Sequence, residues 1–265
     1  MVGGFFATQK RSSLEDRFFW NGGKKMQRFA PMVAIDVATK AVAVDLFDQL
    51  ETATPKPIVK LGMELYYTAG PDIIRLARQR GFKVFLDLKL YDIPNTVGRA
   101  MKGLGKLGVS FVTVHAAGGK EMLQAALDGL EAGASAVNLP LPNLLAITEL
   151  TSINQQIMNE EQGIPGELVT TVQRYAKLAD EVGLAGVVCS AQEVTAIRQV
   201  TSAGFYCVTP GIRPVGSAKG DQKRVVTPAQ AHQLGANAIV CGRPITQAES
   251  VRDAYEAIAK EFLEG

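Results

Sequence analysis

The chain has 265 residues, of which 47% are hydrophobic and 20% charged, and its formal net charge is +2. This length and composition fit one large domain with a buried core and exclude a disordered chain. The small net charge gives no reason to expect a nucleic acid or a membrane surface as a partner, and the apolar runs are too short for a transmembrane helix.

Residues 1–28 differ in character from the rest of the chain. They contain two Gly-Gly pairs, an aromatic cluster at residues 18–20 and several basic residues, but no long apolar core typical of a secretory signal. Glu15 and Asp16 argue mildly against a transit peptide. We therefore expect a loose N-terminal extension over residues 1–28 and one folded domain over residues 29–265.

From Pro31 onward, short β-rich runs alternate with amphipathic helical runs. Eight strands are predicted, at residues 32–37, 58–61, 83–88, 111–114, 144–148, 186–189, 206–209 and 238–241. Apolar residues at helical spacing predict seven helices, around residues 42–50, 73–81, 97–107, 122–130, 168–178, 194–200 and 251–262. Alternating strands and helices predict a parallel sheet covered by helices. Eight strands, with no G-x-G-x-x-G after the first, favour an α/β fold built as a single (β/α)₈ TIM barrel over an open sheet.

The third predicted strand carries charges at its end, in the run Asp87-Leu-Lys89. Successive strand side chains alternate between faces, so Asp87 and Lys89 share one face and the neighbouring leucines share the other. The leucines suit the helix-covered outside of a barrel. We therefore expect both charges to point into the barrel, near the rim where enzymes of this fold carry their active sites.

Adjacent strand ends and one loop add further ionisable residues: Asp36 after the first strand, Lys60 in the second, and Asp92 after the third. These charges could form a buried network of ion pairs that only neutralise one another and bind no substrate, because structural ion-pair networks are common. Charges on three consecutive strands at the catalytic rim favour a functional site instead. Alternating carboxylates would keep the lysines protonated, and a protonated lysine is a general acid rather than a Schiff-base nucleophile.

The last two predicted strands run into loops that suit phosphate binding. The first loop contains Gly211 and Arg213, and the second begins with Gly242 and Arg243. Loops at these two places in a (β/α)₈ barrel often bind phosphate, and an arginine can hold two phosphate oxygens. The Gly-, Ser- and Lys-rich loop between the two strands suits a lid, with Gln222 as a candidate donor. Ordinary surface loops with exposed arginines are the alternative.

Histidine and cysteine give weaker signals. His115 follows the fourth strand and could be an acid or base, but the lysines already supply an acid, so a hydrogen-bonded structural role is favoured. Cys189, Cys207 and Cys241 are typical of buried thiols in a reducing, cytoplasmic compartment. No zinc site is predicted from two scattered histidines, whereas an Asp- or Asn-based Mg²⁺ site stays open.

One run, Asp87-Leu-Lys89-Leu-Tyr-Asp92-Ile-Pro-Asn-Thr96, resembles the signature of orotidine 5'-phosphate decarboxylases. Other runs that resemble this family follow in order: Val59-Lys60-Leu-Gly-Met-Glu-Leu-Tyr-Tyr67, His115-Ala-Ala-Gly-Gly119, Leu150-Thr151-Ser152, Val208-Thr-Pro-Gly-Ile-Arg213, Asp221-Gln222 and Gly242-Arg243-Pro-Ile-Thr246. The resemblance covers nearly all of the chain from Pro31 onward. The D-x-K-x-x-D spacing by itself also occurs in related sugar-phosphate barrels.

The resemblance implies an enzyme without cofactor or metal that removes CO₂ from orotidine 5'-phosphate to make UMP, the last step of pyrimidine nucleotide synthesis. In this family Lys89 would protonate C6 of the pyrimidine and Asp87 would lie against the departing carboxylate, while Lys60 and Asp92 complete the charge network. The implied substrate contacts are Asp36 and Lys60 to the ribose, Thr151 to the base region, and Arg213, Gln222, Gly242 and Arg243 to the 5'-phosphate. The implied homodimer has Asp92, Ile93 and Thr96 reaching into the partner's active site.

Two other functions stay open at this point. One is a Mg²⁺-dependent sugar-phosphate decarboxylase or aldolase on the same barrel. The other is a catalytically silent barrel that only binds nucleotides, which the complete set of charges argues against.

Overall fold

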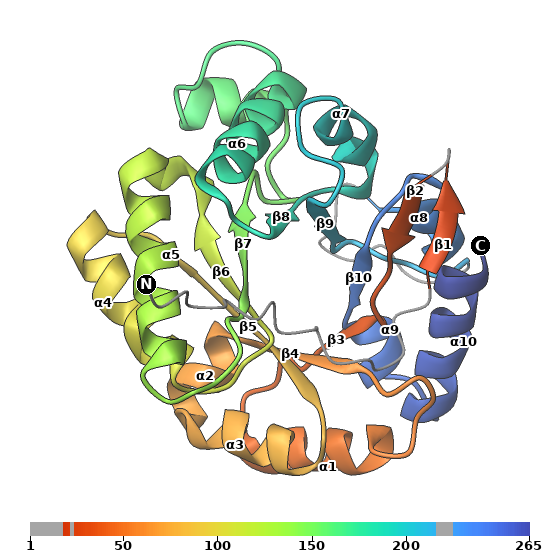
Figure 1. Cartoon of the computed structure of the whole chain (residues 1–265). Coiled ribbons are helices and arrows are strands. Elements are labelled where there is room, and N and C mark those ends of the chain that lie inside the picture. The colour runs from red at the N-terminus through yellow and green to blue at the C-terminus, as the bar shows by residue number, and fades with distance from the viewer. Residues whose placement is uncertain (1–17, 22–23, 216–224) are drawn as a thin grey trace, which may run out of the picture.

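The computed structural model describes residues 18–21, 24–215 and 225–265, and its centre is a closed barrel of eight parallel strands (Figure 1). Each strand pairs with the next, and the last pairs with the first, so the barrel has no open edge. This confirms the predicted (β/α)₈ barrel. The barrel strands are β3 (Met32–Ala34), β4 (Ile58–Gly62), β5 (Lys83–Leu90), β6 (Phe111–His115), β7 (Asn143–Ile147), β8 (Gly186–Val188), β9 (Tyr206–Thr209) and β10 (Ala238–Cys241).

Helices surround the barrel (Figure 1), and each of the seven predicted helical runs falls on one of them. Three further helices, α2, α8 and α9, have seven, six and four residues and were not predicted. No helix in the described ranges is both long enough and apolar enough to cross a membrane. The helices are α1 (Lys40–Leu50), α2 (Met63–Ala69), α3 (Asp72–Gln79), α4 (Pro94–Gly105), α5 (Gly119–Ser135), α6 (Leu168–Val182), α7 (Val194–Arg198), α8 (Pro228–Gln233), α9 (Arg243–Thr246) and α10 (Val251–Glu264), with short turns η1 (Ala116–Gly118), η2 (Ile157–Glu161) and η3 (Ala191–Glu193).

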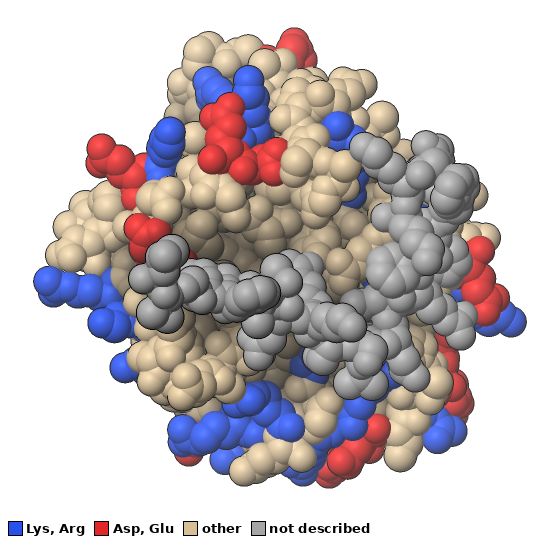
Figure 2. All heavy atoms as spheres, viewed as in Figure 1, with Lys and Arg blue, Asp and Glu red and all other residues tan. Residues whose placement is uncertain are grey.

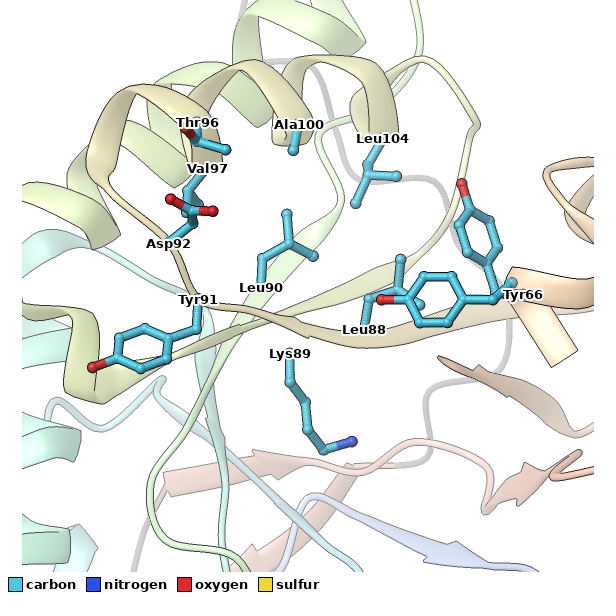
Figure 3. A pocket seen from close by; sticks show the side chains of 11 residues that line it. Tyr66, Leu88, Lys89, Leu90, Tyr91, Asp92, Thr96, Val97, Ala100 and Leu104 are labelled. Atoms are coloured by element: carbon cyan, nitrogen blue, oxygen red, sulfur yellow. The ribbon is translucent and has the colours of Figure 1, made fainter. Parts of the chain in front are cut away.

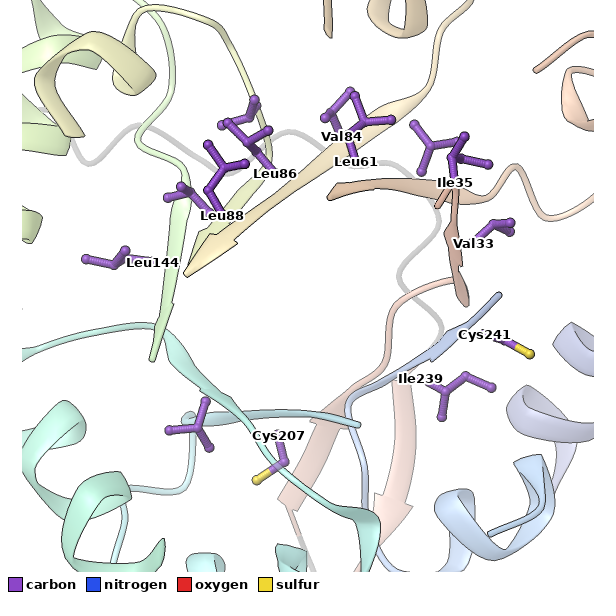
Figure 4. Packing of buried hydrophobic residues seen from close by; sticks show 14 of the residues in the cluster. Val33, Ile35, Leu61, Val84, Leu86, Leu88, Leu144, Cys207, Ile239 and Cys241 are labelled. Atoms are coloured by element: carbon purple, nitrogen blue, oxygen red, sulfur yellow. The ribbon is translucent and has the colours of Figure 1, made fainter. Parts of the chain in front are cut away.

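The larger apolar core lies between the barrel and the helices. Strand residues such as Val84, Leu86 and Leu88 are buried there and point away from the barrel interior (Figure 4). Burying one such side chain contributes about 1.5–3 kcal/mol. The leucines of β5 therefore fix which residues of that strand must face inward.

All three cysteines, Cys189, Cys207 and Cys241, are buried in this outer core as free thiols, as predicted. Burial raises the pKa of the Cys241 thiol to about 12, although Arg213 acts in the opposite direction. Inside the hydrophobic layer these side chains serve as small apolar residues.

A second, smaller apolar cluster fills one end of the barrel interior. Phe29, just before β3, packs edge-to-face against Phe111 and Tyr206, with ring centroids 5.2 and 5.1 Å apart. Phe85 joins the same cluster. Phe111 and Tyr206 are the first residues of β6 and β9, and Phe85 is the third of β5. Inward-facing residues further along these strands therefore lie above the apolar cluster.

Before the barrel, β1 (Phe18–Asn21) and β2 (Lys24–Gln27) form an antiparallel pair. The last residue of β2, Gln27, touches the barrel: its side-chain oxygen accepts from the Tyr206 hydroxyl at 2.7 Å, and its carbonyl accepts from Asn237 at 2.7 Å. Residues 1–17 lie outside the described ranges, and the domain boundary at residue 28 stays a prediction.

Candidate functional site

Three charged side chains meet inside the barrel at the carboxyl ends of β4 and β5. Lys89 Nζ lies 2.9 Å from Asp87 Oδ2, and Lys60 Nζ lies 3.6 Å from the same oxygen. The side chains of Lys60 and Asp87 are only 10% and 11% exposed. Figure 3 shows Lys89 pointing away from Leu88 and Leu90. The predicted inward direction of both charged residues of β5 is therefore confirmed.

Asp36 reaches this network from the loop after β3, and its Oδ1 accepts a hydrogen bond from Lys60 Nζ at 2.9 Å. The predicted strand at residues 32–37 was too long, because pairing with β4 ends at Ala34 and the chain then turns toward α1. Gly62 makes room for the ion pair, since a Cβ there would lie 2.9 Å from Asp36 Oδ1 and 3.3 Å from Lys60 Nζ. Strand β4 therefore ends in glycine because a larger residue would collide with the Asp36–Lys60 ion pair.

The carboxyl group of Asp87 is held in its ionised form. Burial alone would raise its pKa, but the charges of Lys60 and Lys89, together with hydrogen bonds from Lys89 and Thr113, keep the pKa below its ordinary value. A fixed negative charge between two lysine side chains therefore persists at neutral pH. Such an arrangement can repel one anionic group of a ligand while attracting negative charge at a neighbouring atom.

Strand β5 is irregular where it carries these charges. Its pairing with β6 passes from Leu86 opposite Val112 to Leu90 opposite Val114, so four steps along β5 match two along β6. Within this stretch Lys89 has φ of 52°, in the left-handed region that non-glycine residues seldom adopt. Strained backbone of this kind gathers at functional sites, where the surrounding structure must hold it.

Thr113 on β6 contacts both charged residues of β5. Its Oγ1 accepts from the Lys89 backbone N–H at 2.8 Å and donates to Asp87 Oδ1 at 3.0 Å, and the residue is fully buried. Sequence reasoning missed Thr113, because a neutral hydroxyl in an apolar strand carries no charge signal. Its place two residues before His115, facing inward beside the charged strand, was the available clue.

Three of the predicted site residues, Asp92, Ile93 and Thr96, are exposed. Asp92 Oδ1 accepts from the Ile93 backbone N–H at 2.6 Å. Figure 3 shows Asp92 and Thr96 on the opposite side of β5 from Lys89. Within this chain, therefore, Asp92 does not join the charge network.

A groove of about 530 Å³ runs along this exposed side, between α2, the end of β5 and α4. Tyr66, Tyr67 and Tyr91 line it, and Figure 3 labels the rings of Tyr66 and Tyr91. Tyr67 is 71% exposed and Ile93, near the start of α4, is 65% exposed. Large exposed apolar groups gathered on one face are typical of an interaction surface.

The predicted phosphate residues lie at the same rim, in the segments that follow β9 and β10. Arg243 is exposed and begins α9, while a Cβ at Gly242 would lie 3.3 Å from the Cβ of Ala34 on neighbouring β3. Arg213 follows β9 and is partly buried, with one guanidinium nitrogen donating to the Ile212 carbonyl at 2.8 Å. Measured along the curved sheet, three strand spacings, or about 14 Å, lie between β10 and β5. Gln222 lies outside the described residues.

The face viewed in Figure 1 is drawn with all its atoms in Figure 2. The Lys, Arg, Asp and Glu side chains that can be seen lie mostly around the periphery, with a hollow of other residues inside them. A small ligand that binds in such a hollow would have most of its surface buried.

Two further candidate residues lie at or beyond the carboxyl ends of β6 and β7. Thr151 follows β7 and is partly buried. His115 ends β6, and its Nδ1 accepts from the Ala117 backbone N–H at 3.2 Å while its ring lies 5.7 Å from that of Tyr91. Burial, and then the charge of Lys89, lower the pKa of His115, so the ring is neutral at pH 7. These contacts favour the structural role predicted for His115.

Among the residues that the structure describes, no three His, Cys, Asp or Glu side chains gather in a way that could hold a metal ion. The predicted independence from metals and cofactors stays a prediction that an assay must test.

Comparison with known proteins finds close relatives along most of the chain. A family model described as "Orotidine 5'-phosphate decarboxylase / HUMPS family" matches residues 30–258. The orotidine 5'-phosphate decarboxylase of Lactococcus lactis subsp. cremoris (strain MG1363) is 48% identical, over 89% of this chain and 99% of the relative. That of Streptococcus pneumoniae serotype 19F (strain G54) is 51% identical, over 90% and 99%. The crystal structure of orotidine 5'-phosphate decarboxylase from Lactobacillus acidophilus is similar, with a TM-score of 0.78 and 44% identity over 88% of this chain and 98% of that one.

Proposed function

This chain belongs to the orotidine 5'-phosphate decarboxylase / HUMPS family, and we propose on that premise that it converts orotidine 5'-phosphate to UMP and CO₂. The observation that carries the proposal is the buried network of Lys60, Asp87 and Lys89 at the catalytic rim of the barrel. A carbanion that forms beside a lysine can be both stabilised and protonated there. The reaction is a carboxy-lyase step, and UMP places it at the end of pyrimidine nucleotide synthesis.

The chemistry follows from the charges of the network. The bond between C6 and the carboxylate carbon breaks, CO₂ leaves, and the electron pair remains on C6. Asp87 lies beside the substrate carboxylate and repels it, whereas Lys89 attracts the charge that develops at C6. Lys89 then gives its proton to C6 and regains one from water. Lys60 holds Asp87 and Asp36 in place through contacts of 3.6 and 2.9 Å.

The remaining predicted residues are proposed to bind the rest of the nucleotide. Arg213, Gly242 and Arg243 follow adjacent strands at the rim and suit the 5'-phosphate, with Gln222 as a fourth contact. Asp36 and Lys60, which lie between these two segments and β5, are proposed to bind the ribose hydroxyls. Thr151, after β7, would contact the base region.

The direct test is an assay of the purified chain with orotidine 5'-phosphate. The loss of substrate absorbance and the release of CO₂ are measured. We expect turnover at the same rate with and without EDTA, because the proposed steps use only charges of the protein. A rate that falls on chelation and returns with Mg²⁺ would favour the metal-dependent barrel instead. Absence of turnover, with tight UMP binding, would favour a catalytically silent nucleotide-binding barrel.

We further propose that the chain acts as a homodimer with shared active sites. Asp92, Ile93 and Thr96 are exposed beside a groove with tyrosine rings, and the Asp92 carboxylate has no place in the network of its own protomer. A twofold dimer that buries this face would carry these residues to the partner. The second site would receive its Asp92 in the same way.

Co-expression of two inactive variants, Lys89→Ala and Asp92→Asn, with different affinity tags tests this sharing. Each variant alone has two defective sites, whereas a mixed dimer has one defective site and one intact site. Random pairing should therefore restore about a quarter of the native sites. Activity that appears only in the doubly tagged fraction supports the proposal. A doubly tagged dimer as inactive as its parents would contradict it, and sedimentation of each variant controls for assembly.

The proposed location is the cytoplasm. Three buried, unpaired cysteines suit a reducing compartment. The proposed product also belongs to a nucleotide pathway whose later steps consume UMP inside the cell.

A further inference from the structure

One buried hydroxyl joins the two charged residues of β5. Thr113 Oγ1 accepts from the Lys89 N–H at 2.8 Å and donates to Asp87 Oδ1 at 3.0 Å. A threonine hydroxyl has one proton to donate and lone pairs to accept, so both bonds can exist together. The Lys89 ammonium donates to the other carboxylate oxygen, Oδ2, so Thr113 and Lys89 hold different oxygens of Asp87.

The same hydroxyl supports the irregular part of β5. At Lys89 the backbone has φ of 52°, and the regular pairing of β5 with β6 is interrupted between Leu86 and Leu90. Along a regular ladder the N–H of Lys89 would meet a carbonyl of the neighbouring strand. Here the Thr113 side chain accepts that bond, and it thereby stabilises a conformation that a lysine seldom adopts.

We propose that Thr113 is a positioning residue that sets the geometry of the Asp87–Lys89 pair through its hydroxyl. The proposal rests on the decarboxylase function proposed above. Without the hydroxyl, the Asp87 carboxylate can turn about its side-chain bonds and the Lys89 backbone can relax toward an extended conformation. Both changes shift charged atoms relative to the carboxylate and C6 of the substrate. The proposed phosphate residues, which follow β9 and β10, are untouched, so the effect falls on the chemical step.

Two substitutions separate the hydroxyl from the rest of the side chain. Thr113→Val keeps the branched shape and removes the hydroxyl, whereas Thr113→Ser keeps the hydroxyl and removes the methyl group. We expect Thr113→Val to lower kcat by about 100-fold, because misplacement of reacting groups by about 1 Å has effects of that size. KM and the dissociation constant of UMP should change by no more than about threefold, and Thr113→Ser should keep most of kcat.

The unaltered protein is assayed first, so that the two proposals fail separately. No turnover by that protein overturns the decarboxylase function and this inference with it. Turnover by the unaltered protein, with kcat unchanged in Thr113→Val, overturns the role of Thr113 alone. An equal loss in Thr113→Ser and Thr113→Val also overturns it, since the methyl group would then be responsible. If Thr113→Val does not fold, as judged by its thermal transition, Thr113→Ala supplies the hydroxyl-free variant.

Discussion

Lys89→Ala should lower kcat/KM by at least about 10⁴-fold, the largest effect that we expect from any single substitution in this chain. The lysine has two roles in the proposed reaction. As a general acid it contributes about 10²–10⁴-fold, and as a charge beside the developing carbanion it contributes about 10²–10³-fold. Single-turnover measurement of UMP formation, with enzyme in excess over substrate, would isolate the chemical step.

The loss must be separated from misfolding. Lys83→Ala is a matched control, because Lys83 begins the same strand and is exposed at the opposite end of the barrel. It should keep full activity and the same thermal transition. Lys89→Ala should also remain folded, since Asp87 keeps its contacts with Lys60 and Thr113. Near-normal release of CO₂ by Lys89→Ala would remove the lysine from the mechanism.

The barrel was predictable because its signals are local. Each buried strand is a short run of apolar residues, and each long covering helix repeats its apolar residues at a fixed spacing. Side chains alternate between the two faces of β5, so the outward direction of the neighbouring leucines was enough to predict that Asp87 and Lys89 point inward. The short helices α2 and α9 gave no such repeat, and the end of β3 depends on where its pairing with β4 stops.

The site was predictable only as far as charge reveals it. Buried charges are costly, so Lys60, Asp87 and Lys89 in apolar strands demanded an explanation. The positive φ of Lys89 and the role of Thr113 follow instead from how β5 pairs with β6, and no local pattern states that register. Sequence reasoning also grouped Asp92 with the network because it lies three residues after Lys89. In the folded chain its carboxylate instead accepts from the Ile93 backbone N–H.

Arg243→Ala should have the second largest effect, raising KM and lowering kcat together. Its guanidinium is proposed to hold the 5'-phosphate at the start of α9, about three strand spacings from the reacting carbon. Two charge-assisted hydrogen bonds of about 1.5–3 kcal/mol each correspond to a loss of about 10²–10⁴-fold in kcat/KM. Part of this loss should appear in kcat, because binding energy from a remote group can align the reacting group with the charges of the site.

The substrate without its phosphate supplies the decisive comparison. Orotidine cannot use the arginine, so the unaltered protein and Arg243→Ala should decarboxylate it at the same slow rate. Arg252→Ala, which removes an arginine that is half exposed on α10, is the matched control and should leave both substrates unaffected. If Arg243→Ala slowed orotidine as much as orotidine 5'-phosphate, the arginine would act on the shape of the site and not on the phosphate. An unchanged affinity for UMP would lead to the same conclusion, because UMP carries the phosphate but no group that reacts.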